Sequence, residues 1–446
     1  MIGFETIGNA TLTLFDDEPI LTTDPWIFGN PYFGSWGHKY IIPEEQLKNI
    51  NKCKFVWLSH GHPDHIDPDS FNLFEGKKIL LADHYNKRIF NDLSKKYDCI
   101  ELKSNTWFQI SKNIRIKSFS DWNQDSSLLV EILKKDIIFN LNDGQALGWS
   151  SEIKKIIKNY QNRFLLRLIS WGDADMINFY DHHDKFILPL AAEKKPCGQT
   201  YAYNLKSWGC NFAVPFSSMH KYVRDDSLKM NKFTTPLELH YEKFNNKYGE
   251  MLPAFLKWNT PKQDYEKINP KENLNEIKSS NYYGDNWSDQ LEQDDKITLK
   301  NYFSKFYHLK KKFGFINFII GKKEFHIKLS DRKEGIEFKT PRNSLIYSIN
   351  NNIFDDLLIG NFMKTKLINV PSLYPDFTPY VTKYGDNAKV YSKHELKEYF
   401  DYYKLNSSNF WIDFLKLKSE TFIRAKLGSH KSIYYLARSI RRSLPV

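Results

Sequence analysis

The chain has 446 residues, and its 64 Lys or Arg residues outnumber its 53 Asp or Glu residues to give a formal net charge of +11. A composition of 41% hydrophobic, 16% aromatic and 26% charged residues is that of a globular protein, and the length suffices for two or three domains of roughly 100–200 residues each. A mostly disordered chain, a collagen-like chain and a lone peptide-binding module are therefore excluded.

The first 258 residues alternate between short apolar runs and one-sided apolar segments. Runs at 11–15 and 20–22 around a turn at 16–19 predict a hairpin at the start of a sheet. Residues 150–160, with isoleucines on one face, predict a helix. Further buried strands are predicted at 54–59, 79–81, 114–116, 128–133 and 137–140. Hairpins with intervening helices indicate a layered α/β domain over residues 1–258.

A polar, turn-rich stretch at 259–296 is predicted to be a linker. Beyond it, 314–320 and 324–329 flank Gly321 as a hairpin, and 353–362 predict a helix, so residues 297–446 are expected to form an α+β accessory domain. We expect this domain to act in dimerisation or substrate gating, and the oligomeric state is left open. The final helix is expected to dock on its own domain or, as the alternative, on an anionic membrane surface. Its apolar stripe is Ile433, Leu436, Ala437, Ile440 and Leu444, beside Arg438, Arg441 and Arg442.

Cysteine spacing, hydropathy and charge indicate the cellular compartment of the protein and the kinds of partner it can have. Cys53, Cys99, Cys197 and Cys210 show no paired spacing, which argues against a zinc ribbon or a disulfide framework. No apolar stretch approaches the roughly 20 residues of a membrane span. The positive charge would suit nucleic acid, anionic lipid or a phosphorylated substrate, but codon bias towards Lys, Asn and Ile produces the same balance. We therefore expect a cytoplasmic protein without a nucleic-acid partner.

The informative motif is the segment 59–65, which places His60, His62, Asp64 and His65 within six positions directly after a predicted strand. These side chains cannot all share one helical face, and Gly61 with a neighbouring proline indicates a loop that turns them towards a common point. Imidazole nitrogens and carboxylate oxygens are ligands of first-row metals. The motif therefore predicts a metal site.

With this HxHxDH loop the sequence resembles the metallo-β-lactamase superfamily over residues 2–225. The resemblance implies an αββα sandwich in which His60 and His62 bind one metal ion, while Asp64 and His65 bind a second. The segments 8–11 and 23–26 support it. It also implies that Asp24 hydrogen-bonds a ligand near the loop, although an ordinary Asp-Pro turn is the alternative.

The resemblance supplies further ligands after later strands. Asp143, in the segment 137–144, matches a bridging aspartate, with an Asp-Gly turn as the alternative. His220 matches the histidine that completes the second ion, and the pair His182 and His183 competes with it. The resemblance gives Asp64 and Asp143 the catalytic roles.

One departure from the superfamily affects the choice of metal. Hydrolytic members carry another histidine ligand between the motif and the bridging aspartate, but the matching stretch 119–125 contains none. Asp121 is the first candidate to replace it and Asp125 the second. A carboxylate in that place favours iron or manganese over zinc, and the superfamily's diiron oxygenases show a similar exchange.

A closer resemblance, through the segments 24–29, 32–36 and 214–216, is to the CMP-N-acetylneuraminate hydroxylase branch. That branch carries a Rieske cluster on Cys-x-His pairs, which this sequence lacks, so an oxygenase would need a separate electron donor. The expected function is a diiron, O₂-dependent hydroxylase of a small anionic sugar or sugar-nucleotide-like substrate. Two alternatives stay open: a metal-dependent hydrolase of a phosphoester, ester or lactone, and a non-catalytic, metal-stabilised binding protein.

Two further segments carry weaker signals. The stretch 171–183 is rich in acids and aromatics, and it either lines a substrate pocket, with Asp173 or Asp175 bonding hydroxyl groups, or is a surface loop. Residues 354–361 weakly resemble sterol-carrier-like accessory domains. The histidines after residue 300 are expected to be structural.

Overall fold

The computed structural model of the protein describes residues 1–170 and 176–427. The chain divides into two compact units. The first comprises Met1–Ile177 and Pro189–Tyr283, and the second comprises Asn178–Leu188 and the chain from Gly284 onward. The predictions for Asp173 and Asp175 and for the apolar stripe after residue 433 lie outside the described residues.

The first unit contains an eight-stranded sheet with the order β18-β17-β1-β2-β3-β5-β6-β7. The hairpin predicted at 11–22 is confirmed, because β2 and β3 pair antiparallel. From β3 onward the strands run parallel, so that β5, which precedes the HxHxDH loop, lies between β3 and β6. The strand bounds are β1 Ile2–Ile7, β2 Thr11–Asp16, β3 Glu18–Thr23, β5 Phe55–Leu58, β6 Lys78–Ala82, β7 Asp98–Leu102, β17 Leu256–Asn259 and β18 Asp264–Lys267.

A seven-stranded sheet with the order β16-β14-β12-β11-β10-β9-β8 forms the second layer. Its central strands, including the predicted strands at 128–133 and 137–140, are buried along their whole length, as expected for a sheet that is covered on both faces. The strand bounds are β8 Trp107–Gln109, β9 Ile114–Ser120, β10 Ser126–Ile132, β11 Asp136–Asn142, β12 Asn162–Arg167, β14 Phe212–Pro215 and β16 Glu250–Met251.

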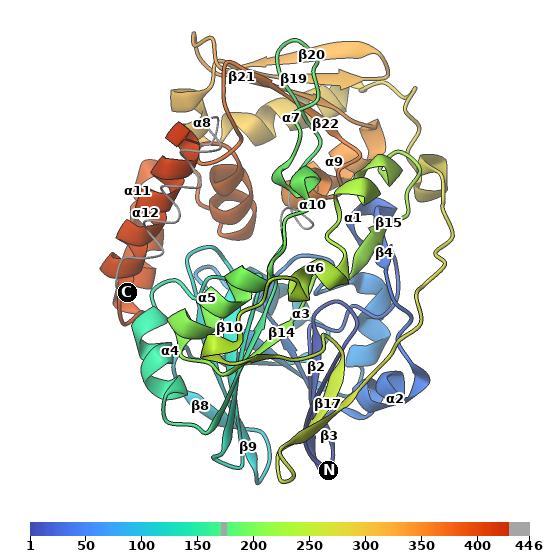
Figure 1. The fold of residues 1–446 in the computed structure, drawn as a ribbon. Helices are drawn as coiled ribbons and strands as arrows, with labels where there is room; N and C mark the ends of the chain where they lie inside the picture. The colour runs from blue at the N-terminus through green and yellow to red at the C-terminus, as the bar shows by residue number, and fades with distance from the viewer. Residues whose placement is uncertain (171–175, 428–446) are drawn as a thin grey trace. The chain divides into compact units, whose positions relative to one another are not determined.

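The alternation of side chains along the strands builds the layers. Leu128 and Val130 of β10 enter one apolar core together with residues of the first sheet, such as Leu14 of β2. Leu129, which points the other way, packs with α4 (Ser150–Ile157) and α5 (Gly198–Trp208). The helices α2 (Glu44–Lys52) and α3 (Arg88–Leu93) cover the outer face of the first sheet. Figure 1 shows α4 and α5 beside the strands of the second sheet. The predicted αββα sandwich is therefore confirmed.

The structure divides the chain differently from the predicted domains at 1–258 and 297–446 and the linker at 259–296. β18 lies inside that stretch, pairs with β17 and extends the first sheet, and the first unit ends only at Tyr283. The side chains of β18 are all exposed. A polar edge strand has the composition of a linker, which is why the sequence alone did not distinguish the two.

The second unit has a five-stranded sheet with the order β13-β22-β21-β19-β20. The hairpin predicted around Gly321 is confirmed by the pairing of β19 with β20. Residues 178–188 contribute β13, which pairs with β22 from far along the chain. The strand bounds are β13 Phe179–Tyr180, β19 Phe315–Ile320, β20 Lys323–Lys328, β21 Gly335–Lys339 and β22 Lys364–Ile368. The helix bounds are α7 Gln293–Ser304, α8 Tyr307–Lys312, α9 Arg342–Asn351, α10 Phe354–Ile359, α11 Lys393–Leu405 and α12 Phe410–Leu427. The sheet and helices make this unit α+β, and its sterol-carrier-like character stays a prediction.

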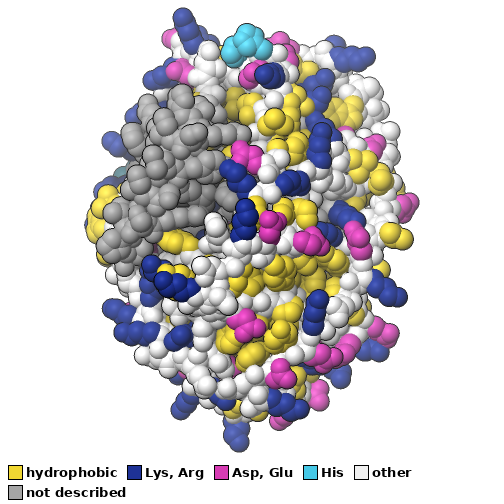
Figure 2. Space-filling model, in the orientation of Figure 1, with side chains coloured by type: hydrophobic (Ala, Val, Ile, Leu, Met, Phe, Trp, Pro, Cys, Tyr) yellow, Lys and Arg dark blue, Asp and Glu magenta, His cyan; other side chains and the backbone are white. Residues whose placement is uncertain are grey.

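Hydropathy, cysteine state and surface charge can be read from the described residues. None of the helices described is both long and apolar enough to cross a membrane. The four cysteines are free thiols. On the face shown in Figure 2, Lys and Arg side chains are spread among Asp and Glu side chains instead of forming one basic patch.

Candidate metal centre

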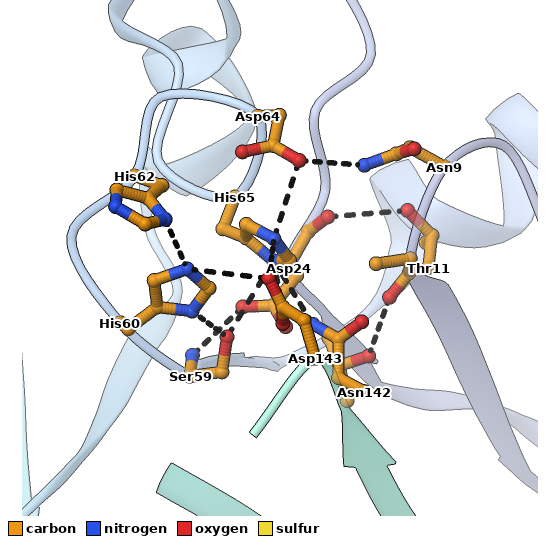
Figure 3. Close-up of polar contacts among 12 residues, drawn as sticks. Asn9, Thr11, Asp24, Ser59, His60, His62, Asp64, His65, Asn142 and Asp143 are labelled. Atoms are coloured by element: carbon orange, nitrogen blue, oxygen red, sulfur yellow. Dashed lines mark hydrogen bonds and ion pairs between the residues drawn. The ribbon is translucent and has the colours of Figure 1, made fainter. Parts of the chain in front are cut away.

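Three strand ends meet at the HxHxDH loop (Figure 3). The loop follows β5, and Asp24 directly follows β3, the parallel neighbour of β5. Carboxyl ends of adjacent parallel strands lie at the same edge of a sheet, which brings Asp24 beneath the loop. Asp143 follows β11 of the second sheet. The sandwich therefore gathers residues that are up to 119 positions apart, counted from Asp24 to Asp143.

His60, His65 and Asp143 form the central cluster. One ligand atom from each lies within 4.8 Å of the others. The Oδ2 atom of Asp143 lies 3.8 Å from Nε2 of His60 and also 3.8 Å from Nε2 of His65. Both histidines are buried, whereas the Asp143 side chain is 26% exposed. A single carboxylate oxygen thus faces both imidazoles from a side that solvent reaches.

Polar groups surround the Nδ1 atoms of the two histidines, and Nδ1 of His65 lies 3.5 Å from the Ser59 hydroxyl oxygen and 3.3 Å from Nδ2 of Asn142. The hydroxyl oxygen of Ser59 lies 2.9 Å from Nδ1 of His60, and Oδ2 of Asp24 lies 3.2 Å from Nδ1 of His65. The other oxygen of Asp24, Oδ1, accepts the backbone N–H of Ser59 at 2.7 Å. A carboxylate at Nδ1 keeps the ring proton there and leaves Nε2 available for an ion. Asp24 thus contacts both His65 and the backbone of Ser59, and its role beside an ion stays a prediction.

The other two residues of the motif extend the cluster. Nδ1 of His62 lies 2.8 Å from Nε2 of His60. The buried carboxylate of Asp64 accepts hydrogen bonds from Asn9 Nδ2 at 2.9 Å and from the Tyr32 hydroxyl at 2.5 Å. Its Oδ2 atom lies 3.3 Å from Nε2 of His65. The motif therefore presents imidazole and carboxylate atoms to one region, and their binding of metal stays a prediction.

The ionisable side chains of this cluster shift one another's pKa values. Burial would raise the pKa of Asp64, but the neighbouring His65 outweighs burial and holds that pKa well below its usual value. Burial, followed by the nearby His65, lowers the pKa of His60, and Asp143 opposes the shift. Burial also acts against charge on His65, yet the carboxylates of Asp64, Asp24 and Asp143 raise its pKa well above the usual value. The cluster therefore favours a positive charge among these carboxylates.

His220 lies at the start of β15 (His220–Tyr222), which pairs with β4 (Trp36–His38). Its ring stacks on Trp36 with a centroid distance of 3.5 Å and an interplanar angle of 3°. Burial lowers its pKa to about 3. Neither ring nitrogen has a hydrogen-bond partner within the described residues. An unsatisfied buried imidazole suits an ion ligand, although His220 does not belong to the three-residue cluster. The competing His182 and His183 are exposed residues of the second unit.

The turn between β9 and β10 places its two aspartates in different roles. The oxygens of buried Asp121 accept the backbone N–H groups of Asn123 at 2.7 Å and of Leu147 at 3.2 Å. Asp125 acts electrostatically on His60, and a Cβ built on Gly144 would lie 3.6 Å from the Cβ of Asp125. The assignments of Asp121 and of its alternative Asp125 as a ligand both stay predictions; the oxygens of Asp121 already accept two backbone N–H groups, whereas the Asp125 side chain accepts no hydrogen bond within the described residues.

Sequence reasoning gave no role to two residues of the site, Tyr32 and His84. Tyr32 has φ 56° and ψ 53°, and the next residue, Phe33, is also left-handed, at φ 59°. Such backbone is costly for non-glycine residues and persists where the surroundings hold it. Nη1 of fully buried Arg224 donates a hydrogen bond to the Phe33 carbonyl oxygen at 2.9 Å. No local sequence signal marks Tyr32 as a partner of Asp64.

His84 lies two residues after β6, just as His60 lies two residues after β5. This equivalent position is the only feature of the sequence that could have indicated His84 as a residue of the site. Burial lowers the pKa of His84 to about 4, and both Asp125 and His60 act on it electrostatically. The edge of the first sheet therefore carries a further imidazole near the cluster.

No family model and no curated protein matches the chain. Among solved structures, an isothiocyanate hydrolase from Delia radicum gut bacteria is 14% identical, and the match covers 58% of this chain and 99% of that one at a TM-score of 0.36. A mutant of the CmlA beta-hydroxylase is 13% identical, with 39% and 36% covered and a TM-score of 0.29. The metallo-beta-lactamase fold protein YhfI from Bacillus subtilis is 13% identical, with 55% and 88% covered and a TM-score of 0.30.

At these identities and TM-scores the matches carry no information about the substrate or reaction of this chain. The assignment of fold rests on the chain itself: two facing sheets lie between helices, and the HxHxDH loop follows β5 at the sheet edge. The first unit has the metallo-β-lactamase fold. The resemblance to the CMP-N-acetylneuraminate hydroxylase branch stays a prediction.

Proposed function

We propose that the chain is a dinuclear metalloenzyme, with iron as its metal, that hydroxylates a small anionic substrate in an O₂-dependent reaction. The observation that carries the proposal is the equal 3.8 Å separation of Asp143 Oδ2 from Nε2 of His60 and of His65. In the proposed site these imidazoles belong to different ions, and a shared carboxylate oxygen is what a bridging ligand requires.

The donor atoms fit two ions. His60, His62 and the Asp125 carboxylate would hold one ion, and Asp64, His65 and His220 the other, with Asp143 between them. The buried, unpartnered ring nitrogens of His220 support its inclusion. Ser59 and Asp24 would hold the ring protons on Nδ1 and keep the Nε2 atoms of His60 and His65 available.

The donor set favours iron over zinc. Three carboxylates beside four imidazoles make a harder, more anionic site than one built mainly of histidine. A reduced iron pair supplies the electrons for O₂ chemistry, and a separate protein would have to restore them. Lys39, the residue after β4, acts electrostatically on His220, and a lysine near this side of the proposed site would suit an anionic substrate.

Metal analysis combined with two activity assays tests the proposal. We expect about two irons per chain in protein purified from iron-supplied cells, a visible ferric charge-transfer absorption, and substrate-dependent O₂ uptake with a reducing protein partner. His65→Ala is expected to lose bound metal. Colourless, zinc-loaded protein that hydrolyses a phosphodiester without O₂ would instead support the hydrolase. Metal retention without turnover in either assay would support a binding protein.

A further inference from the structure

The second unit contains a cavity of about 160 Å³ at the start of α8 and α11. Its floor consists of the buried side chains of Phe306 and Val390. Its mouth is formed by exposed residues, among them Lys311 and Lys393. The cavity therefore passes from an apolar, aromatic interior to a cationic entrance. An engineered apolar cavity of about 150 Å³ binds benzene, so this volume suits one six-membered ring.

One wall of the cavity is flat and rigidly held. The rings of His308 and Tyr380 stack with a centroid distance of 3.4 Å and an interplanar angle of 3°. Nε2 of His308 lies 3.0 Å from Oδ1 of Asp376, and Nζ of Lys312 lies 3.3 Å from the same oxygen. This ion-paired network fixes the orientation of the wall, and a rigid flat surface favours a planar ligand over a puckered one.

The lysines at the mouth favour an anionic ligand, although the carboxylate of Glu395 also lies at the start of α11. No acidic side chain lines the cavity within the described residues. Neither Lys311 nor Lys393 forms an ion pair in this described part of the chain, and Nζ of Lys311 lies 4.6 Å from the ring centroid of Tyr307, which also lines the cavity. Glu395 already accepts the backbone N–H groups of Tyr391 and Ser392, both at 2.8 Å. The two lysines, and not the amides at the start of α11, are therefore the groups available to an incoming negative charge.

We propose that this cavity is a binding site for one planar aromatic ring that carries a single negative charge, of the aryl carboxylate class. The ring occupies the space between the His308 and Tyr380 wall and the apolar floor, and the carboxylate meets the lysines at the mouth. The site lies wholly within the second unit and needs no metal, so it is independent of the function proposed for the first unit.

Benzoate is the probe, and the full chain stripped of metal by a chelator is the sample. We expect saturable binding in the millimolar range or tighter by ligand-observed NMR and calorimetry, as suits a ligand of this size. Benzyl alcohol keeps the ring without the charge, and cyclohexanecarboxylate keeps the charge without the flat ring. Each is expected to bind at least about tenfold more weakly, which corresponds to about 1.4 kcal/mol.

Matched variants locate the site. The double variant Lys311→Gln with Lys393→Gln is expected to weaken benzoate about tenfold and to leave benzyl alcohol unchanged. Leu396→Trp, which fills the cavity, is expected to abolish binding of both, and Tyr380→Ala repeats the test if the tryptophan variant does not fold. Lys333→Gln removes an exposed lysine elsewhere in the unit and serves as the control. The proposal is overturned if benzoate does not bind, if cyclohexanecarboxylate binds equally well, or if the cavity variants bind benzoate like the unaltered chain.

Discussion

Asp121 and Asp125 lie in one turn, and we expect their removal to have opposite consequences. The side-chain oxygens of Asp121 accept two backbone N–H groups, one of them from Leu147 in a distant loop. Asp125 is half-buried, its side chain accepts no hydrogen bond within the described residues, and it acts electrostatically on His60. The first aspartate is therefore expected to stabilise the fold and the second to bind metal.

The magnitudes follow from these contacts. Hydrogen bonds to a charged group contribute about 1.5–3 kcal/mol each, so Asp121→Ala should lower the free energy of unfolding of the metal-free protein by about 3 kcal/mol or more. Asp121→Asn keeps one carbonyl acceptor and should lose about half as much. Asp125→Ala should change the unfolding free energy by less than about 1 kcal/mol, but the bound metal should fall from about two ions per chain to about one.

Urea unfolding of metal-free protein, followed by tryptophan fluorescence, measures the first effect, and elemental analysis after reloading measures the second. Asp125→Asn, which removes the charge at nearly constant volume, is the matched control for metal loss. The reasoning is refuted if Asp121→Ala loses metal at unchanged stability while Asp125→Ala retains both ions; Asp121 would then be the ligand. If neither change alters metal content, this turn supplies no ligand, and the case for iron loses its third carboxylate.

Two further predictions concern side chains of the site, and a third concerns His240, a buried residue of the helix Leu237–Tyr241 whose Nδ1 lies 3.0 Å from the Tyr201 hydroxyl oxygen. Tyr32→Phe removes the hydroxyl that Asp64 accepts and should weaken the binding of one ion about 10–100-fold, measured against a competing chelator; unchanged affinity would contradict the contact. Asp24→Asn should weaken metal binding by a similar factor, because the anionic partner of His65 Nδ1 is lost, and an unaltered titration would show that Asp24 is only a turn residue. Burial lowers the pKa of His240 to about 4, so the unfolded chain binds its proton first, and stability should fall as pH decreases from about 6.5 to 4. His240→Gln should make that fall shallower by up to about 1.4 kcal/mol per pH unit in pH-dependent unfolding, and an identical slope would rule out this origin.

Local sequence patterns predicted much of the secondary structure of the first unit. The short apolar runs at 128–133 and 137–140 predicted two strands that the structure confirms, because a strand that is buried on both faces has a nearly continuous apolar sequence. The HxHxDH loop predicted a cluster of ligands for a comparable reason: its residues lie within six positions, so their proximity needs little tertiary structure.

Tertiary structure decided what depends on distant residues. β18 and the linker expected at 259–296 have the same polar composition, and only pairing with β17 distinguishes a strand from a linker. Residues 178–188 belong to the second unit because their strand β13 pairs with β22, formed by Lys364–Ile368. No local sequence pattern at either strand predicts this pairing.

The same division holds within the site. From the sequence alone, Asp121 and Asp125 were equivalent carboxylates four positions apart, ranked only by their order in a resemblance. Their difference arises because the backbone N–H of Leu147 folds onto Asp121, while Asp125 comes to lie beside Gly144. Likewise, Tyr32 meets Asp64 from a left-handed turn whose Phe33 carbonyl oxygen accepts a hydrogen bond from Arg224, 191 positions after Phe33. A sequence motif specifies which chemical groups are present at a site, but the hydrogen bonds that each group already makes, and therefore what it has left to bind, are set by parts of the chain that meet only in the folded protein.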